Sequence, residues 1–144
     1  LGADLLVKTL PSVFDRTAVM EKQPEESPTP YASMITKQMG LMNFSKPAEE
    51  LERLVRGMNP WPSAYTFING KTLKVWKCKV SGEQTDAIPG TVFLTDKEGI
   101  HVACEKGTLI LTEVQLEGKK RMDTEAFLRG YHIEKGTCFT DHKE

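Results

Sequence analysis

The first apolar residues of the chain follow helical spacing and then stop at a proline. Four leucines carry this pattern: Leu1, Leu5, Leu6 and Leu10. They predict a helix with one apolar face, which we expect to end near Pro11 because proline cannot donate the next backbone hydrogen bond. Residues 21–30 then hold three prolines and four charged side chains. They have almost nothing to bury, and predict an extended linker.

A second amphipathic helix is predicted over residues 47–58. Pro47 suits a first helical turn, and Ser45 is the expected side-chain cap. The apolar stripe consists of Ala48, Leu51, Leu54, Val55 and Met58. Glutamates and arginines occupy the other positions, so this helix should pack on a core by one side only. The segment 59–62, Asn-Pro-Trp-Pro, ends it.

Trp61 lies between two prolines and has two interpretations. It is either an exposed residue that faces a ligand, or a wedge buried at the joint between helix and strand. We favour the wedge, because large aromatic side chains mostly contribute packing. We therefore expect Trp61 in a core shared with these residues: Leu51, Leu54, Val55, Leu73 and Val75.

From Ala64 onward the apolar period changes to two, which is typical of strands. Residues 65–68 and 71–80 flank Asn69-Gly70, a dipeptide that favours a tight hairpin turn. In the second strand the apolar positions change phase after Val75. Either both faces are buried or a β-bulge shifts the register there.

Three shorter strands are predicted near residues 90–94, 100–104 and 108–115. A short helix should follow at 124–129, capped by Asp123 and ended by Gly130. The tail from Tyr131 onward alternates weakly and could add an edge strand. The fold class predicted is mainly β with short helices: a small five-stranded OB-like barrel, preceded by a linker and a helix from another domain.

Composition fits one domain with an extension. The chain has 144 residues, 39% of them hydrophobic, and a net charge of −1. No apolar stretch approaches the ~20 residues of a membrane span, and the first residues do not resemble a secretory signal. Three separated cysteines suggest reduced, structural thiols. Residues 31–80 hold eight basic against three acidic residues, whereas the rest of the barrel region is acidic. Polyanion binding would therefore need local basic faces.

The sequence contains no convincing catalytic or metal-binding set. His101, His132 and His142 lack the spacing of paired metal ligands. No nucleophile elbow, P-loop or dinucleotide fingerprint is present. His101 lies within an alternating strand, and we expect it at the surface or rim of the barrel.

Basic residues are the better candidates for binding. Lys119, Lys120 and Arg121 form a run in a glycine-led loop, where they could reach phosphates or be only a solvated turn. Lys71 and Lys74 lie on the predicted hairpin with two further lysines. These could instead be ordinary edge-strand lysines. Neither patch contains interleaved aromatic residues in the sequence, which disfavours readout of bases by stacking.

Several segments in order resemble one family. Residues 54–62 with Ala64-Tyr65-Thr66, and residues 116–122, Leu-Glu-Gly-Lys-Lys-Arg-Met, are similar to signatures of methionyl-tRNA formyltransferases. Residues 1–6, the prolines near 23–26 and Lys37 extend the resemblance to nearly the whole chain. Gln38, Ser63 and the segment 42–44 depart from the usual pattern, which affects packing more than the basic positions.

The resemblance implies a division of the chain and a function. Residues 1–20 would be a remnant helix of an amino-terminal catalytic domain, 21–36 a linker, and 37–144 the carboxy-terminal barrel. The parent enzyme would take its formyl group from 10-formyltetrahydrofolate, with no catalytic residue, cofactor or metal in this part. Its partners would be initiator methionyl-tRNA and its own catalytic domain, in a cytoplasmic monomer. The RNA-binding residues would be Lys37, Lys71, Lys74, Lys119, Lys120 and Arg121.

Two alternatives remain. The barrel could belong to a related formyltransferase that acts on a sugar nucleotide or on the folate itself, as a module without RNA binding. It could also be a free-standing protein-interaction barrel. The Lys119–Arg121 loop favours tRNA, and the absence of an initiator methionine favours a part of a longer protein.

Overall fold

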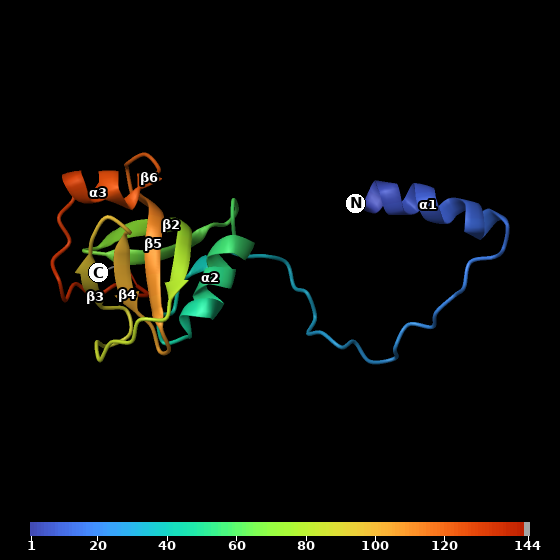
Figure 1. Ribbon diagram of the computed structural model, residues 1–144, viewed down its shortest axis with the longest axis horizontal. Helices are drawn as coiled ribbons and strands as arrows, with labels where there is room; N and C mark the ends of the chain where they lie inside the picture. The colour runs from blue at the N-terminus through green and yellow to red at the C-terminus, as the bar shows by residue number, and fades with distance from the viewer. Residues whose placement is uncertain (143–144) are drawn as a thin grey trace. The chain divides into compact units, whose positions relative to one another are not determined.

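The computed structural model describes residues 1–142 as two compact units, residues 1–33 and 34 onward (Figure 1). The first unit contains α1 (Gly2–Phe14). The second contains all other elements, in chain order: η1 (Lys37–Gly40), α2 (Ala48–Gly57), β1 (Ala64–Ile68), β2 (Lys71–Ser81), β3 (Val92–Thr95), β4 (Ile100–Ala103), β5 (Thr108–Leu116), β6 (Met122–Asp123) and α3 (Thr124–Gly130).

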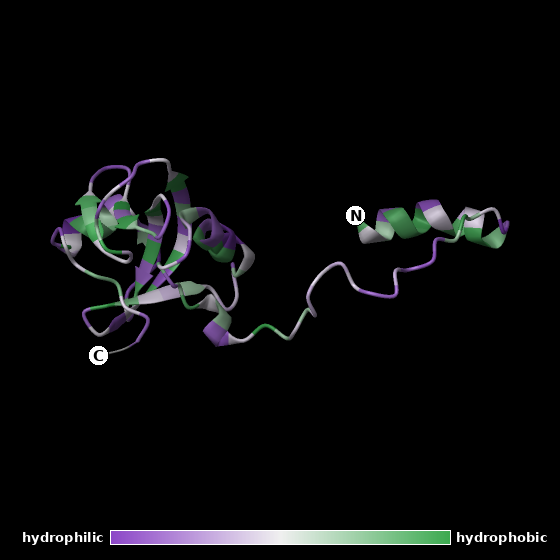
Figure 2. Cartoon of the chain, turned by 90° about the horizontal axis from the view of Figure 1, so that it is seen from below, coloured by the Kyte–Doolittle hydropathy of each residue, from purple (hydrophilic) through white to green (hydrophobic). Residues whose placement is uncertain are grey.

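The helix α1 extends further than the sequence pattern predicted. It includes Pro11 and ends at Phe14, because the carbonyl of Pro11 accepts a bond from the amide of Asp15 at 2.9 Å. None of its residues is buried, and Leu5 and Leu6 are 63% and 59% exposed. Figure 2 shows green apolar positions along this helix. Residues 21–30 form no helix or strand, and all are exposed.

The second unit is built on one antiparallel sheet with the strand order β1-β2-β5-β4-β3, and β6 pairs with the far end of β5. The fold class is therefore confirmed as mainly β, OB-like, with short helices. The sheet has a sixth, short strand, β6, in addition to the five that were predicted. Among the described residues no ladder joins β1 to β3. Instead the tail bridges both edges, through Phe67 with Thr140 and Thr91 with Cys138.

The hairpin and the bulge follow from local sequence. Asn69 and Gly70 have φ values of 48° and 69°, and join β1 to β2 in the predicted turn. The β2–β5 register shifts on both sides of Lys77, so a bulge is present. Because of this extra residue, Val75 and Cys78 both face the core although they are three positions apart.

The core lies between the curved sheet and α2, which packs on β2 and β5 (Figure 1). Fully buried members come from every long strand: Ile68, Leu73, Val75, Val92, Ile100, Leu109, Leu111 and Val114. From α2, Leu51 and Val55 are buried and Leu54 is partly buried. The predicted cap of α2 is wrong: Ser45 does not cap it, and the amide of Ala48 instead donates to the carbonyl of Lys106 at 3.0 Å.

Trp61 is not part of this core. Its side chain is 59% exposed in the turn between α2 and β1, so the wedge interpretation is wrong. At this joint Ser63 and Ala64 are buried instead, and Gly40 lies close against the backbone of Ser63 and the ring of Tyr65. At the other end of the sheet the prediction for α3 is confirmed, since Asp123 accepts a bond from the amide of Ala126 at 2.7 Å.

Candidate nucleic-acid interface

The predicted basic residues lie on the surface, and most of them lie near one another. Lys71 and Lys74 are exposed on the first half of β2, and Lys119 and Lys120 are exposed in the turn after β5. Since β2 pairs with β5, with Lys74 opposite Gln115, the two groups come to the same end of the sheet. Lys37 is also exposed, on η1 beside β1.

Backbone contacts fix the turn that carries Lys119 and Lys120. The amide of Glu117 donates to the carbonyl of Thr72 at 2.8 Å, and the Glu117 carboxylate accepts from the amide of Thr72 at 3.0 Å. The amide of Lys119 closes the turn by donating a hydrogen bond to the carbonyl of Leu116 at 2.9 Å. The two lysines are therefore held beside the first residues of β2.

Trp76 is the residue that the sequence analysis missed. Its half-buried ring lies on the outer face of β2, with the Arg121 guanidinium 4.5 Å and the Lys74 ammonium 5.9 Å from the ring centroid. Its indole N–H donates to Gln115 Oε1 at 3.2 Å, and the Gln115 amide donates to the carbonyl of Lys119 at 3.0 Å. The statement that no aromatic residue interleaves the basic patches is therefore wrong. The alternation Lys74-x-Trp76 was the available signal.

Glu113 forms ion pairs with two of the cations on this face. Its carboxylate lies 2.8 Å from the Lys77 ammonium and also accepts from Arg121 Nε. The hydrogen bonds from Arg121 and Lys77 lower the pKa of Glu113 from 4.5 to about 2. Arg121 thus already forms an ion pair with Glu113 and a cation–π contact with the Trp76 ring. Lys74, Lys119 and Lys120 have no ion pair within residues 1–142.

This pKa shift gives a pH-dependence of stability. Because the folded-state pKa lies below the ordinary one, the ion pairs stabilise the fold fully above pH about 4.5, and this contribution is lost as pH falls toward about 2. We expect Glu113→Gln to lower the free energy of unfolding at pH 7 by up to about 1 kcal/mol, a small value because the partner cations are exposed. Urea unfolding of both proteins between pH 7 and pH 2 should show the difference vanishing in acid. A difference that stays constant would contradict the assignment.

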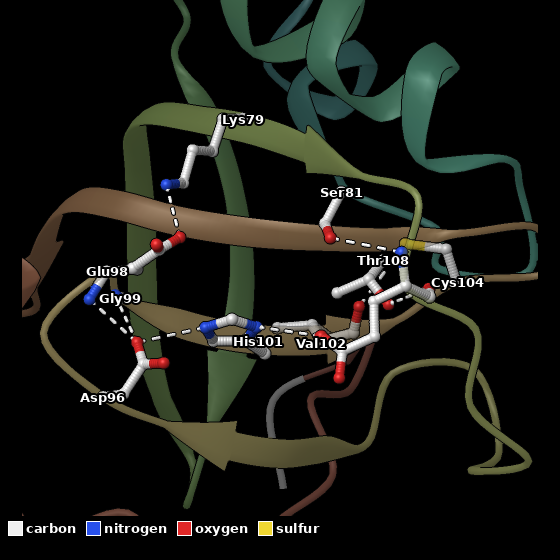
Figure 3. A network of polar contacts seen from close by, with 10 residues as sticks. Lys79, Ser81, Asp96, Glu98, Gly99, His101, Val102, Cys104 and Thr108 are labelled. Carbon is white, nitrogen blue, oxygen red and sulfur yellow. Dashed lines mark hydrogen bonds and ion pairs between the residues drawn. The ribbon is translucent and has the colours of Figure 1, made fainter.

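A second polar cluster surrounds His101 on β4 (Figure 3). His101 is only 4% exposed, so its predicted surface position is wrong. Both faces of β4 are covered, because the chain between β2 and β3 lies over its outer side, where Glu83 approaches His101 Nδ1 at 3.6 Å. Asp96 contacts His101 Nε2 at 3.1 Å.

Asp96 organises the turn between β3 and β4 (Figure 3). Its Oδ1 accepts from the amides of Glu98 and Gly99 at 2.8 and 3.2 Å. Burial raises the pKa of Asp96, but these bonds and the one to His101 outweigh it, so the pKa lies below its ordinary value. These contacts join the turn to β4, and we assign the cluster a structural role.

Two of the three cysteines are partly or fully buried, and residues 1–142 contain no metal-binding group. Burial raises the pKa of Cys78 to about 12 and of Cys104 to about 11, so both are neutral thiols at physiological pH. Those residues contain no group of three potential ligands placed to hold a metal ion. No helix found there is long and apolar enough to cross a membrane. The basic face around Trp76 is the most distinctive candidate site.

Comparison with known proteins gives concordant results. A family model described as "Formyl transferase, C-terminal domain" matches residues 34–132. Methionyl-tRNA formyltransferase of Agathobacter rectalis is 51% identical over 96% of this chain and 44% of its own length. The protein of the same name from Bacillus subtilis is 48% identical over 94% of this chain and 43% of its own length. The chain thus spans less than half of these curated relatives.

Solved structures show the same fold at low identity. A crystal structure of HypX from Aquifex aeolicus matches with a TM-score of 0.58 and 14% identity, over 96% of this chain and 27% of that one. Another, of HypX in complex with tetrahydrofolic acid, matches with a TM-score of 0.55 and 16% identity, over 94% of this chain and 26% of that one. At this identity the likeness concerns the fold alone.

Proposed function

This chain belongs to the formyl transferase C-terminal domain family, and from that premise we propose that it is the tRNA-binding part of a methionyl-tRNA formyltransferase. The parent protein would transfer a formyl group from 10-formyltetrahydrofolate to initiator methionyl-tRNA in the cytoplasm. Relatives that carry this name, at 48–51% identity over nearly the whole chain, support the proposal.

One structural observation carries the RNA-binding role. Lys71, Lys74, Lys119 and Lys120 are exposed at one end of the sheet, and the turn that bears two of them is fixed to β2 by backbone bonds. A group of lysines that form no ion pair within residues 1–142 suits phosphate contacts, which position a nucleic acid without reading its sequence. Lys37 would extend this surface along β1. Arg121 would contribute mainly through the Trp76 ring.

The catalytic chemistry would belong to the preceding domain of the parent protein. We propose that α1 is the last helix of that domain and that its exposed leucines pack against it, with residues 21–36 as the linker. The barrel would then hold the tRNA while its aminoacyl end reaches the other domain.

The alternative of a barrel that serves a sugar-nucleotide or folate enzyme is less well supported. The curated relatives are named methionyl-tRNA formyltransferase. A purely structural module would not need several exposed lysines at one end of its sheet. Free-standing interaction barrels are likewise disfavoured, since the relatives are more than twice as long as this chain.

The proposal is tested by titrating labelled initiator tRNA with the 144-residue chain at several salt concentrations. Each phosphate contact contributes roughly 0.7–0.9 to the slope of log affinity against log salt. The double variant Lys119→Ala/Lys120→Ala should therefore lower the slope by about 1.5 and leave the melting temperature unchanged. Arg121 is left in place, because Glu113 already compensates its charge.

A matched control removes two lysines elsewhere. Lys97 and Lys135 are exposed on the β3–β4 turn and in the tail, so Lys97→Ala/Lys135→Ala makes the same change of net charge. The control should bind tRNA like the wild type. If both double variants lower the slope equally, net charge alone governs binding and the assigned surface is wrong.

A further inference from the structure

The outer face of β1 and β2 combines aromatic rings with exposed cations. On β1, Tyr65 and Phe67 are half-exposed, and their rings meet edge to face at 5.7 Å. Tyr65 lies directly opposite Lys74 in the β1–β2 register, and Trp76 follows Lys74 two positions on along the same face. This face of a small sheet therefore presents three aromatic side chains beside Lys74.

The Trp76 ring is held in place by the protein itself. Its N–H is already bonded to Gln115, and Gln115 is bonded in turn to the lysine-bearing turn. The Arg121 guanidinium lies against the ring at 4.5 Å and is fixed by Glu113. A preorganised indole and guanidinium need no reordering to receive a planar ligand, which favours binding.

The charges around the ring favour an anionic ligand. Glu113 is paired with both Lys77 and Arg121, which leaves one positive charge, and Lys74, Lys119 and Lys120 have no ion pair in the described part of the chain. A hollow of about 290 Å³ adjoins Lys74 and Gln115, and Glu117 contributes an acidic group to its wall. Glu117 already accepts a bond from the amide of Thr72, so its carboxylate is engaged.

We infer that Trp76, with Arg121 and Lys74, forms a platform on which an unpaired RNA base stacks while its phosphates meet Lys119 and Lys120. Stacking of splayed bases on aromatic rings or guanidinium planes is how proteins recognise unpaired RNA, whereas paired bases are not accessible in this way. The platform rests on the proposed RNA-binding role and adds to it a contact with a base.

Trp76 fluorescence reports on the platform directly. The chain has two tryptophans, so the exposed Trp61 is first changed to Phe, which leaves Trp76 as the only indole. Four probes are titrated at fixed salt: a single-stranded decamer of uridine, an RNA duplex of equal length, inorganic polyphosphate and polyglutamate. We expect the uridine decamer to quench Trp76, and the duplex and the polyphosphate to bind without comparable quenching.

Two substitutions separate the ring from the charges. Trp76→Leu should weaken binding of the uridine decamer about tenfold without changing the salt slope, since stacking releases no counterion. Trp76→Phe keeps an aromatic ring and should recover most of the affinity. Melting temperatures confirm that each variant is folded. If Trp76→Leu does not fold, quenching in the Trp61→Phe protein and the affinity of Trp76→Phe decide the question.

The outcomes distinguish the two proposals. If Trp76→Leu binds the uridine decamer as tightly as the unsubstituted chain, and the decamer and polyphosphate quench Trp76 equally, the platform is overturned and phosphate binding is left intact. No binding of tRNA or of any RNA probe would overturn both. Quenching by polyglutamate as strong as that by the decamer would indicate an acidic protein partner instead, and would also overturn the platform.

Discussion

Gly99→Ala should cost this fold about 3 kcal/mol or more of unfolding free energy, the largest effect we expect from adding a single methyl group. Gly99 has a φ of 145°, a value that side-chain-bearing residues rarely adopt. An added Cβ would overlap the carbonyl oxygen of Leu111 and lie 3.1 Å from Ile110 Cγ2. Both residues belong to β5, where Leu111 pairs with Ile100, so the central ladder would have to move.

Gly118→Ala is the matched control. Gly118 also has a positive φ, of 75°, but an added Cβ would meet nothing within 4 Å. It should lose only the backbone preference, about 1–2 kcal/mol. Urea unfolding measures both. If the two variants lose the same free energy of unfolding, Gly99 does not approach β5 as closely as in the structure.

The local pattern was sufficient for most of the sheet. Alternation of apolar residues and the Asn69-Gly70 turn fixed the first hairpin, because hairpin pairing depends on adjacent residues. The phase change after Val75 left two alternatives, burial of both faces or a bulge, and the structure has the bulge. Asp123 was recognisable as a cap because its acceptor role involves an amide only three residues away.

Contacts between distant segments could not be read from the sequence. The tail joins β1 through Phe67 and Thr140, which no local signal connects. His101 is buried because a segment far from it in sequence covers β4, although its own alternation suggested an exposed face. Trp61 was expected in the core on residue type alone, yet it is exposed.

The candidate site was only half predictable for the same reason. Exposed lysines and a glycine-led turn can be recognised from composition. The Trp76 platform depends on the register that places Lys74 opposite Gln115, and on the turn that returns Arg121 to Glu113. These relations exist only after β2 and β5 have paired. The basic residues could therefore be identified from the sequence, whereas the contacts that hold the Trp76 ring and its neighbouring cations in place could not.

Under the proposed function, the two loop lysines matter for tRNA and not for the formyl donor. In the full-length protein, Lys119→Ala/Lys120→Ala should raise the KM for initiator methionyl-tRNA roughly 10- to 100-fold at about 0.1 M salt, as expected for two lost phosphate contacts. The KM for 10-formyltetrahydrofolate should stay within about twofold, because we assign folate binding to the other domain. The lost phosphate contacts would stabilise the bound tRNA equally in the ground state and the transition state. Their removal should therefore leave kcat at saturating tRNA nearly unchanged.

Steady-state formylation by the full-length protein separates the contribution of the two lysines to tRNA binding from any effect on the folate. Initial rates are measured with each substrate varied in turn, for the wild type, the double variant and the Lys97→Ala/Lys135→Ala control. We predict a large rise in the tRNA KM for the double variant only, diminishing at high salt because wild-type binding weakens faster there. An unchanged tRNA KM in the double variant, or an equal rise in the KM for the folate, would show that Lys119 and Lys120 do not bind the tRNA.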